Sequence, residues 1–392
     1  MSKSFPIGSQ KNGYINNPIS GKMIKNNLTN QAHASDGTFE EIIWSTLESI
    51  YKYIPTNDGI ALSPYSIAYA LSIVYLGASG QTKEQIKRTM GISLSDADLI
   101  RSLSHNLPSE KVTLINSIAL LIKDNYVIND SFFDLVANAL GGEIIKFTHA
   151  PEAVTKTNTW VSQKTNKMIP SILQLNDVDK DLRLILINAV YFKALWASKF
   201  SQRDTIISNF KGSDKIKKLP MMNKTGYFQY YEDKSYQFIS LPYIDRNYAM
   251  NIALPKIHKQ NVLETPFVDI PQYLMQNTNI HLVLPKFEQR KKYELSEIFK
   301  KNGMIELFTD NANLSLISKL RDIKVSKIIH EVVVKVDEDG TEAAAVTAVV
   351  MTKAMAMRIE KPPIEVIVDH TFYYSIIYIP EQLPLFTGIF NG

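Results

Sequence analysis

The stretch KVDEDGTEAAAVTAVVM, residues 335–351, decides how the rest of this sequence is interpreted. It follows a predicted β-strand, Ile328 to Val336, and passes through a turn at Gly340 into a run of small residues. Alanine is the best helix former, so one interpretation is an ordinary helix, and another is a low-complexity surface loop. β-Branched residues follow the alanines at once, which disfavours the helix. The acidic run at 337–339 is predicted to be a solvated strand end.

In an extended conformation this stretch would place alternate side chains on opposite faces. One face would carry Thr341, Ala343, Ala345, Thr347, Val349 and Met351, and the other would carry Glu342, Ala344, Val346, Ala348 and Val350. The first side chains of the former set are small, so the segment could enter a β-sheet with little steric hindrance. We therefore interpret the stretch as a loop that can become a strand, with Thr341 as its first inward-facing residue.

The surrounding sequence mixes helical and strand patterns without an internal repeat, which predicts one α+β domain over residues 35–392. A first helix is expected from Phe39, capped by Ser35 or Asp36, and a second opens at Pro64 behind Ser63. A further helix is predicted over 158–169, and a central strand over 184–192. Residues 1–34 are polar and rich in Asn, which predicts a flexible extension.

Composition excludes several classes of function. The net charge is +4, and short basic runs lack the aromatic residues that a single-stranded nucleic-acid groove needs, so no nucleic-acid partner is expected. Cysteine is absent, and the seven His are scattered without metal-ligand spacing, so no metal or other cofactor is expected. Nucleotide-binding and hydrolase motifs are missing, so the chain is not expected to be an enzyme. No signal peptide is visible and no apolar run is long enough for a membrane span, which predicts a cytoplasmic protein with unconventional release to the extracellular space as an alternative.

Residues 338–345, EDGTEAAA, resemble the proximal hinge of inhibitory serpins, the serine protease inhibitors. The resemblance extends from about Asp36 to Gly392, and it rests on the joint order of several short motifs. These are SPYS at 63–66, LGA at 76–78, NAVYFKALW at 188–196, LPKF at 284–287, VSKIIH at 325–330 and PLFTG at 384–388.

The resemblance implies three β-sheets, roughly eight to nine helices and an exposed reactive-centre loop at about 338–361. It implies a hinge at the start of that loop, with residues Glu338, Gly340, Thr341, Glu342, Ala343, Ala344 and Ala345. It also implies a shutter and breach, where the main sheet opens, with residues Ser63, Ser66, Asn188, Trp196 and His330. The family usually carries Asn where this chain has Gly59, which predicts a polar cluster short of one hydrogen-bonding group.

The resemblance further implies a suicide-substrate inhibitor that forms a covalent acyl-enzyme with a serine protease and traps it by inserting the cut loop into the main sheet. The usual loop register places the cut between Ala354 and Met355, which indicates an elastase-like or a chymotrypsin- or cathepsin G-like target. Met357 is an alternative of similar specificity, whereas Lys353 or Arg358 would indicate a trypsin-like target. A cysteine protease target and a non-inhibitory chaperone, carrier or storage role are further alternatives. A monomer without a strong heparin site is expected.

Overall fold

The computed structural model describes residues 37–105, 107, 109–179, 181–257, 272–320, 322–341 and 362–392. The hinge residues after Thr341 and every candidate for the cut bond lie outside the described residues, as does the predicted extension. Within the chain, Gly37–Gly392 forms one compact unit. None of the described helices is long and apolar enough to cross a membrane.

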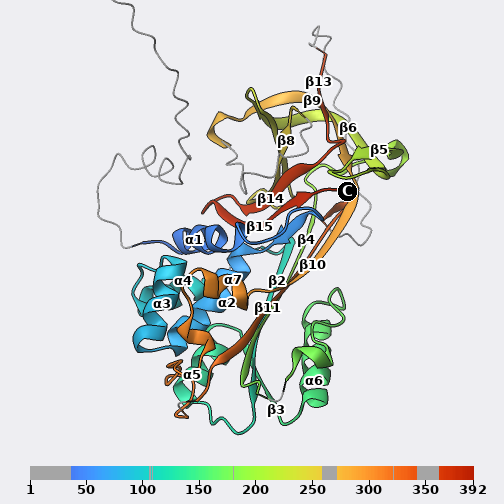
Figure 1. Cartoon of the computed structure of the whole chain (residues 1–392). Coiled ribbons are helices and arrows are strands. Elements are labelled where there is room, and N and C mark those ends of the chain that lie inside the picture. The colour runs from blue at the N-terminus through green and yellow to red at the C-terminus, as the bar shows by residue number, and fades with distance from the viewer. Residues whose placement is uncertain are drawn as a thin grey trace, which may run out of the picture. The chain divides into compact units, whose positions relative to one another are not determined.

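A six-stranded sheet occupies the lower half of Figure 1. In spatial order its strands are β10 (Phe287–Glu294), β11 (Val325–Val336), β12 (Gly340–Thr341), β4 (Leu184–Leu195), β2 (Val112–Lys123) and β3 (Glu143–Phe147). β4 is apolar along nearly its whole length because both of its faces are covered. One face of the sheet packs on the main core, and the other packs under α6 (Ala150–Lys164).

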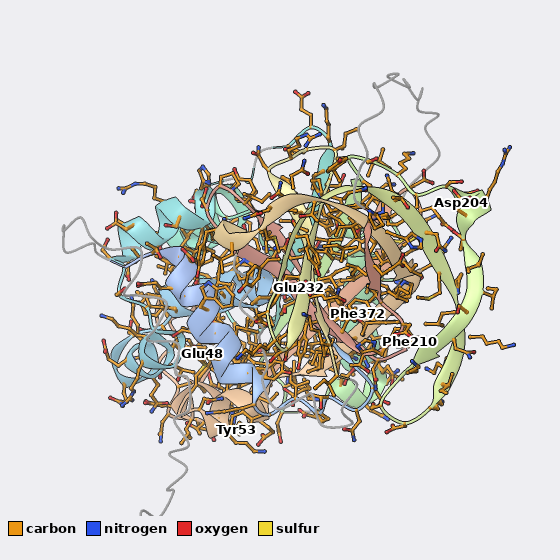
Figure 2. The ribbon with its side chains drawn as sticks, turned by 90° about the horizontal axis from the view of Figure 1, so that it is seen from above. Glu48, Tyr53, Asp204, Phe210, Glu232 and Phe372 are labelled. Atoms are coloured by element: carbon orange, nitrogen blue, oxygen red, sulfur yellow. The ribbon has the colours of Figure 1, made fainter. Side chains whose placement is uncertain are left out.

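A nine-stranded sheet lies above it. Its main path is β1 (Ile60–Leu62), β15 (Leu383–Phe390), β14 (Phe372–Tyr378), β8 (Tyr248–Pro255), β7 (Tyr236–Pro242), β6 (Ile216–Glu232), β9 (Gln276–Pro285) and β13 (Ile364–Ile367), and β5 (Ile206–Lys211) pairs with β6. Aromatic side chains fill its interior. Figure 2 labels two of them, Phe210 and Phe372, whose ring centroids are 6.4 Å apart.

The remaining α-helices gather mainly on the core side of the six-stranded sheet. They are α1 (Phe39–Tyr51), α2 (Pro64–Gly77), α3 (Gly80–Met90), α4 (Asp96–Ser104), α5 (Asp130–Asp134) and α7 (Ser296–Lys301). Short helical turns are η2 (Leu135–Ala139), η3 (Leu175–Asp177), η4 (Gln202–Asp204), η6 (Gln272–Leu274) and η7 (Glu306–Phe308). α2 is buried at every position, so its sequence lacks a polar face.

The α+β class is confirmed, and the counts differ from the expectation. The described residues form two hydrogen-bonded sheets and seven α-helices. There are two sheets and not three because the long strand β6 pairs with β9 over most of its length and with β7 at its end. Two of the three expected sheets are therefore continuous through one strand.

The predicted cap of α1 and the predicted limits of α6 were wrong, whereas α1 begins at Phe39 as expected. α1 is capped by Thr38, whose hydroxyl accepts a hydrogen bond from the Glu41 backbone N–H. α6 begins at Ala150, eight positions before the predicted start at 158, because His149 caps it and a proline lies in its first turn. It ends at Lys164, ahead of Asn166 and Lys167, whose positive φ angles of 50° and 64° cannot continue a right-handed helix.

Candidate functional site: the seam between β4 and β11

The six-stranded sheet is split at its upper end by the two residues of β12. Lower down, β11 pairs directly and in parallel with β4, from Val325 opposite Leu184 to Val333 opposite Tyr191. Above that point, β12 lies between them: Thr341 pairs with Val336 of β11 and with Ala194 of β4. We call the line where β4 meets β11 the seam. The chain after Val336 thus turns back and enters the top of the seam.

Gly340 can occupy this position only because it lacks a side chain. A Cβ atom built there would lie 2.1 Å from the Ala194 carbonyl oxygen and 2.7 Å from the Leu195 Cα. Both contacts are with backbone atoms of β4, which cannot rotate away. The close approach of two backbones therefore requires glycine here.

Thr341 is completely buried at the top of the seam. Its hydroxyl lies 2.6 Å from the Tyr243 hydroxyl, and either oxygen can be the donor. Tyr243 is itself buried, and its ring stacks on Trp196 with centroids 4.7 Å apart. Burial raises the pKa of Tyr243, so the phenol is neutral. A small polar side chain is accommodated here with its one hydroxyl satisfied.

The acidic run before Thr341 is not the solvated strand end that the sequence predicted. The Glu338 side chain is only 7% exposed, and its carboxylate accepts hydrogen bonds from Lys286 Nζ at 2.8 Å and from the Thr205 hydroxyl at 2.9 Å. Burial acts to raise the pKa of Glu338, but these two hydrogen bonds, a backbone hydrogen bond and the charge of Lys286 together outweigh burial and lower the pKa. Asp339 pairs with Lys199 at 2.6 Å. The turn is therefore held by ionic contacts on both sides.

A second set of polar side chains lies under the middle of the seam, where His330 of β11 pairs with Asn188 of β4. His330 Nδ1 donates to Asn188 Oδ1 at 2.6 Å, and its Nε2 accepts from the Ser63 backbone N–H at 3.2 Å. Burial lowers the pKa of His330 to about 3, so the imidazole is neutral. Asn188 Nδ2 donates to the Ser66 hydroxyl at 2.6 Å, and Ser66 donates to Asn116 Oδ1 at 2.6 Å.

Four of the five residues predicted for the shutter and breach therefore meet in one network, whereas Trp196 lies at the upper end of β4, against residues 337–339. Asn116 was missed, although a polar residue within the apolar run of β2 was a usable signal. Tyr243, Lys199, Thr205 and Lys286 were also missed, because each reaches the site only through long-range packing.

Gly59, where the family usually carries Asn, lies beside a buried glutamine of β10. A Cβ atom on Gly59 would lie 2.9 Å from the Gln289 side-chain nitrogen and 2.6 Å from the Ile389 carbonyl oxygen. Gln289 Nε2 donates to that same carbonyl at 2.9 Å, and its Oε1 accepts from the Tyr374 hydroxyl at 2.7 Å. The Gln289 amide thus lies where a side chain at position 59 would extend, and its hydrogen bonds go to Ile389 and Tyr374, which are not part of the His330–Asn188 network.

The predicted site residues beyond Thr341 lie outside the described residues. These are Glu342, Ala343, Ala344 and Ala345 of the hinge and Lys353, Ala354, Met355, Met357 and Arg358 at the cut. Among the residues that the structure describes, no cluster of three or more His, Asp or Glu side chains could hold a metal ion.

Comparison with known proteins matches residues 47–391 to the family model described as serpin (serine protease inhibitor). An uncharacterized serpin-like protein of Acanthamoeba polyphaga mimivirus is 33% identical over 345 residues, which covers 84% of each chain. Leukocyte elastase inhibitor A of Rattus norvegicus is 32% identical over 358 residues, or 85% of this chain and 93% of that protein. The native crystal structure of the thermophilic serpin tengpin superposes with a TM-score of 0.81 at 26% identity, covering 92% of this chain and 96% of that one.

Proposed function

Because the chain belongs to the serpin family, we propose that it is a suicide-substrate inhibitor of a serine endopeptidase. The observation that carries this proposal is the pairing of Gly340 and Thr341 with β4 inside the main sheet. The hinge is already turned toward the seam, and its first inward side chain is small, buried and hydrogen-bonded. A large or charged residue at this position would have to lose its hydration on entry.

The register of β12 indicates what complete insertion would look like. Gly340 lies opposite Leu195 and Thr341 opposite Ala194, so each further residue would pair one position lower on β4. Continued one for one, this register brings Thr347 opposite Asn188 and Met351 opposite Leu184, where β4 begins. Insertion would separate β4 from β11 and replace one set of strand pairs with two, which favours the inserted state.

The polar network under the seam suits such a separation. The His330–Asn188 hydrogen bond crosses the seam, so it must break when a strand enters. An inserted Thr347 would present a hydroxyl at the level of Asn188. Buried polar groups could therefore exchange partners without being left unpaired.

The chemistry of trapping requires a cut in the loop. The protease serine hydroxyl attacks the carbonyl carbon of Ala354, the C–N bond to Met355 breaks, and the new amine leaves with a proton. The ester that remains would normally be hydrolysed by water. Insertion that is faster than this hydrolysis carries the acylated protease toward the lower end of the sheet and halts deacylation. Small or medium apolar residues at the cut support an elastase-like or a chymotrypsin- or cathepsin G-like target, and the relative named leukocyte elastase inhibitor A agrees with the former.

Incubation with elastase, cathepsin G and trypsin, followed by denaturing electrophoresis and mass spectrometry, tests the proposal. We expect a heat- and detergent-stable complex with elastase or cathepsin G, and a released peptide that begins at Met355. A complex with trypsin alone would move the cut to Lys353 or Arg358. Complete loop cleavage without any complex would contradict an inhibitory function and favour a non-inhibitory role.

A further inference from the structure

Lys224 of β6 directs its ammonium group into the turn that follows β4. The ammonium donates to the backbone carbonyls of Ser198 and Lys199, each at 2.7 Å, and to the Ser198 hydroxyl. An ammonium group has three hydrogens to donate, so this one turn satisfies all of them. The nitrogen also lies 5.8 Å from the centre of the Phe200 ring. No ion pair with a carboxylate joins Lys224 to any other described residue, so its role is to hold backbone.

The turn at residues 196–200, which Lys224 holds, is also bonded to residues 337–339 at the start of the hinge. Trp196 donates its backbone N–H to the Asp339 carbonyl and its ring Nε1–H to the Asp337 carbonyl, both at 2.9 Å. The Phe200 backbone N–H donates to the Glu338 carbonyl at 2.9 Å, and Lys199 pairs with Asp339. Every residue from 337 to 339 is thus bonded to this turn. Lys224 therefore does not contact the hinge directly. It holds the turn at 196–200, and that turn holds the hinge.

These contacts would survive loop insertion. Insertion adds residues below Thr341 and leaves 337–341 as the turn between β11 and the new strand. The turn at 196–200 therefore holds the hinge in the conformation that the inserted state also needs. Order that is already present before the cut lowers the entropic cost of the step that follows it.

We propose that Lys224 is a positioning residue for loop insertion, acting through the turn at 196–200 on the hinge at 337–341. This inference rests on the proposed inhibitory function. Without Lys224 the turn loses its three tethers to β6, and the hinge is less ordered when the loop is cut. Insertion then competes less well with deacylation, and more of the inhibitor is consumed as an ordinary substrate.

The test compares Lys224→Met, which keeps the aliphatic stem, with Lys256→Met as a matched control. Lys256 follows β8 in the same upper sheet and pairs with Glu232 at 2.6 Å, away from the turn. Loss of one net hydrogen bond corresponds to about a fivefold change in partitioning. We therefore expect Lys224→Met to raise the number of inhibitor molecules consumed per trapped protease by about that factor, with the rate of initial association unchanged, and Lys256→Met to change neither quantity. If the two variants consumed the same number of inhibitor molecules per trapped protease, the proposal would be overturned.

A second measurement does not depend on inhibition. With Trp44 and Trp160 replaced by Phe, fluorescence reports on Trp196 alone, whose ring contacts Tyr243 and Asp337. Lys224→Met should shift its emission to longer wavelength and increase quenching by acrylamide, and Lys224→Arg, which keeps the charge and several donors, should largely restore the original spectrum. If no protease is trapped by the unaltered chain, the proposed function fails. The altered Trp196 emission would then still support Lys224 as the residue that positions the hinge, and an unaltered emission would refute that role.

Discussion

Thr341 and Tyr243 share a hydrogen bond from which water is excluded. Both side chains are buried, and their oxygens are 2.6 Å apart. A buried hydroxyl without a partner costs more than the hydrogen bond contributes on balance, because its hydration is lost and nothing replaces it. Each hydroxyl therefore supplies the hydrogen-bond partner that the other needs in order to be buried at the top of the seam.

Removing one hydroxyl should therefore be worse than removing both. We expect Thr341→Val and Tyr243→Phe each to lower the free energy of unfolding by about 1–3 kcal/mol, and the double variant to lie close to the unaltered chain. Urea unfolding of the four proteins measures this coupling. Thr225→Val, at an exposed position of β6, serves as the control and should have little effect. Strictly additive losses would show that the two hydroxyls do not depend on each other.

At the scale of the element, β11 carries a charge in an unfavourable place. Glu331 is buried in the middle of the strand, and its Oε1 accepts from Arg290 Nε at 2.7 Å. Its Oε2 is also buried, and it has no hydrogen-bond partner among the described residues. Burial raises the pKa of Glu331 above its usual value in spite of Arg290. The strand that would part from β4 in the proposed insertion is thus less stable in place than an apolar strand would be.

Glu331→Met should stabilise the folded chain. The Arg290 side chain is 39% exposed and can be hydrated once its partner is gone, so little charge is left buried. Replacement of both partners of a buried ion pair by apolar groups is neutral or adds up to about 4 kcal/mol to the free energy of unfolding. Glu331→Met replaces one partner and leaves the other hydrated, so we expect a smaller gain of about 1 kcal/mol. The raised pKa means that the unaltered chain loses stability as the pH rises from 4.5 through the folded-state pKa, and the variant should lack this loss.

Thermal unfolding at pH 5 and pH 8 measures both effects. Glu288→Met, at an exposed position of the neighbouring strand β10, is the matched control. A melting temperature of Glu331→Met below that of the control at pH 8 would contradict the idea that the carboxylate destabilises β11.

The sequence predicted the long elements well and the contacts between them poorly. β4 and β11 were identified because their apolar runs are dense and β-branched. Ser63, Ser66, Asn188 and His330, which meet under the seam, were singled out because short motifs carry them. The start of α6 was misplaced because the capping His149 and the proline after it were given no weight. Tyr243 and Lys224 carry no local signal, since each acquires its role only when the nine-stranded sheet folds over the top of β4. Gln289 likewise carries no local signal, since it lies beside Gly59 although the two residues are 230 positions apart in the sequence.

At the scale of the whole molecule, the seam is the one place in the described sheet where a strand of two residues ends between longer neighbours. β11 and β4 pair directly below it, so the folded chain holds fewer strand pairs than the same chain with the loop inserted. Each added hydrogen bond contributes about 1 kcal/mol on balance. The hydrogen bonds of a strand that continued from Thr341 to the lower end of β4 would therefore contribute on the order of 10 kcal/mol, and the apolar burial that accompanies them offsets the cost of ordering the segment.

Cutting the loop should release this stabilisation without any target protease. We expect a chain nicked within 342–361 by a low-specificity protease to melt at least about 10 °C higher than the intact chain, because the freed segment can enter the seam. Differential scanning calorimetry of intact and nicked samples measures the shift. Ala345→Arg provides the control, since residue 345 would share the inward face with Thr341 and the nicked variant would have to bury a guanidinium group as the loop enters, so it should gain much less. Equal gains in the two nicked proteins would mean that the loop does not enter through the top of the seam, and no gain in either would mean that the native sheet is already complete.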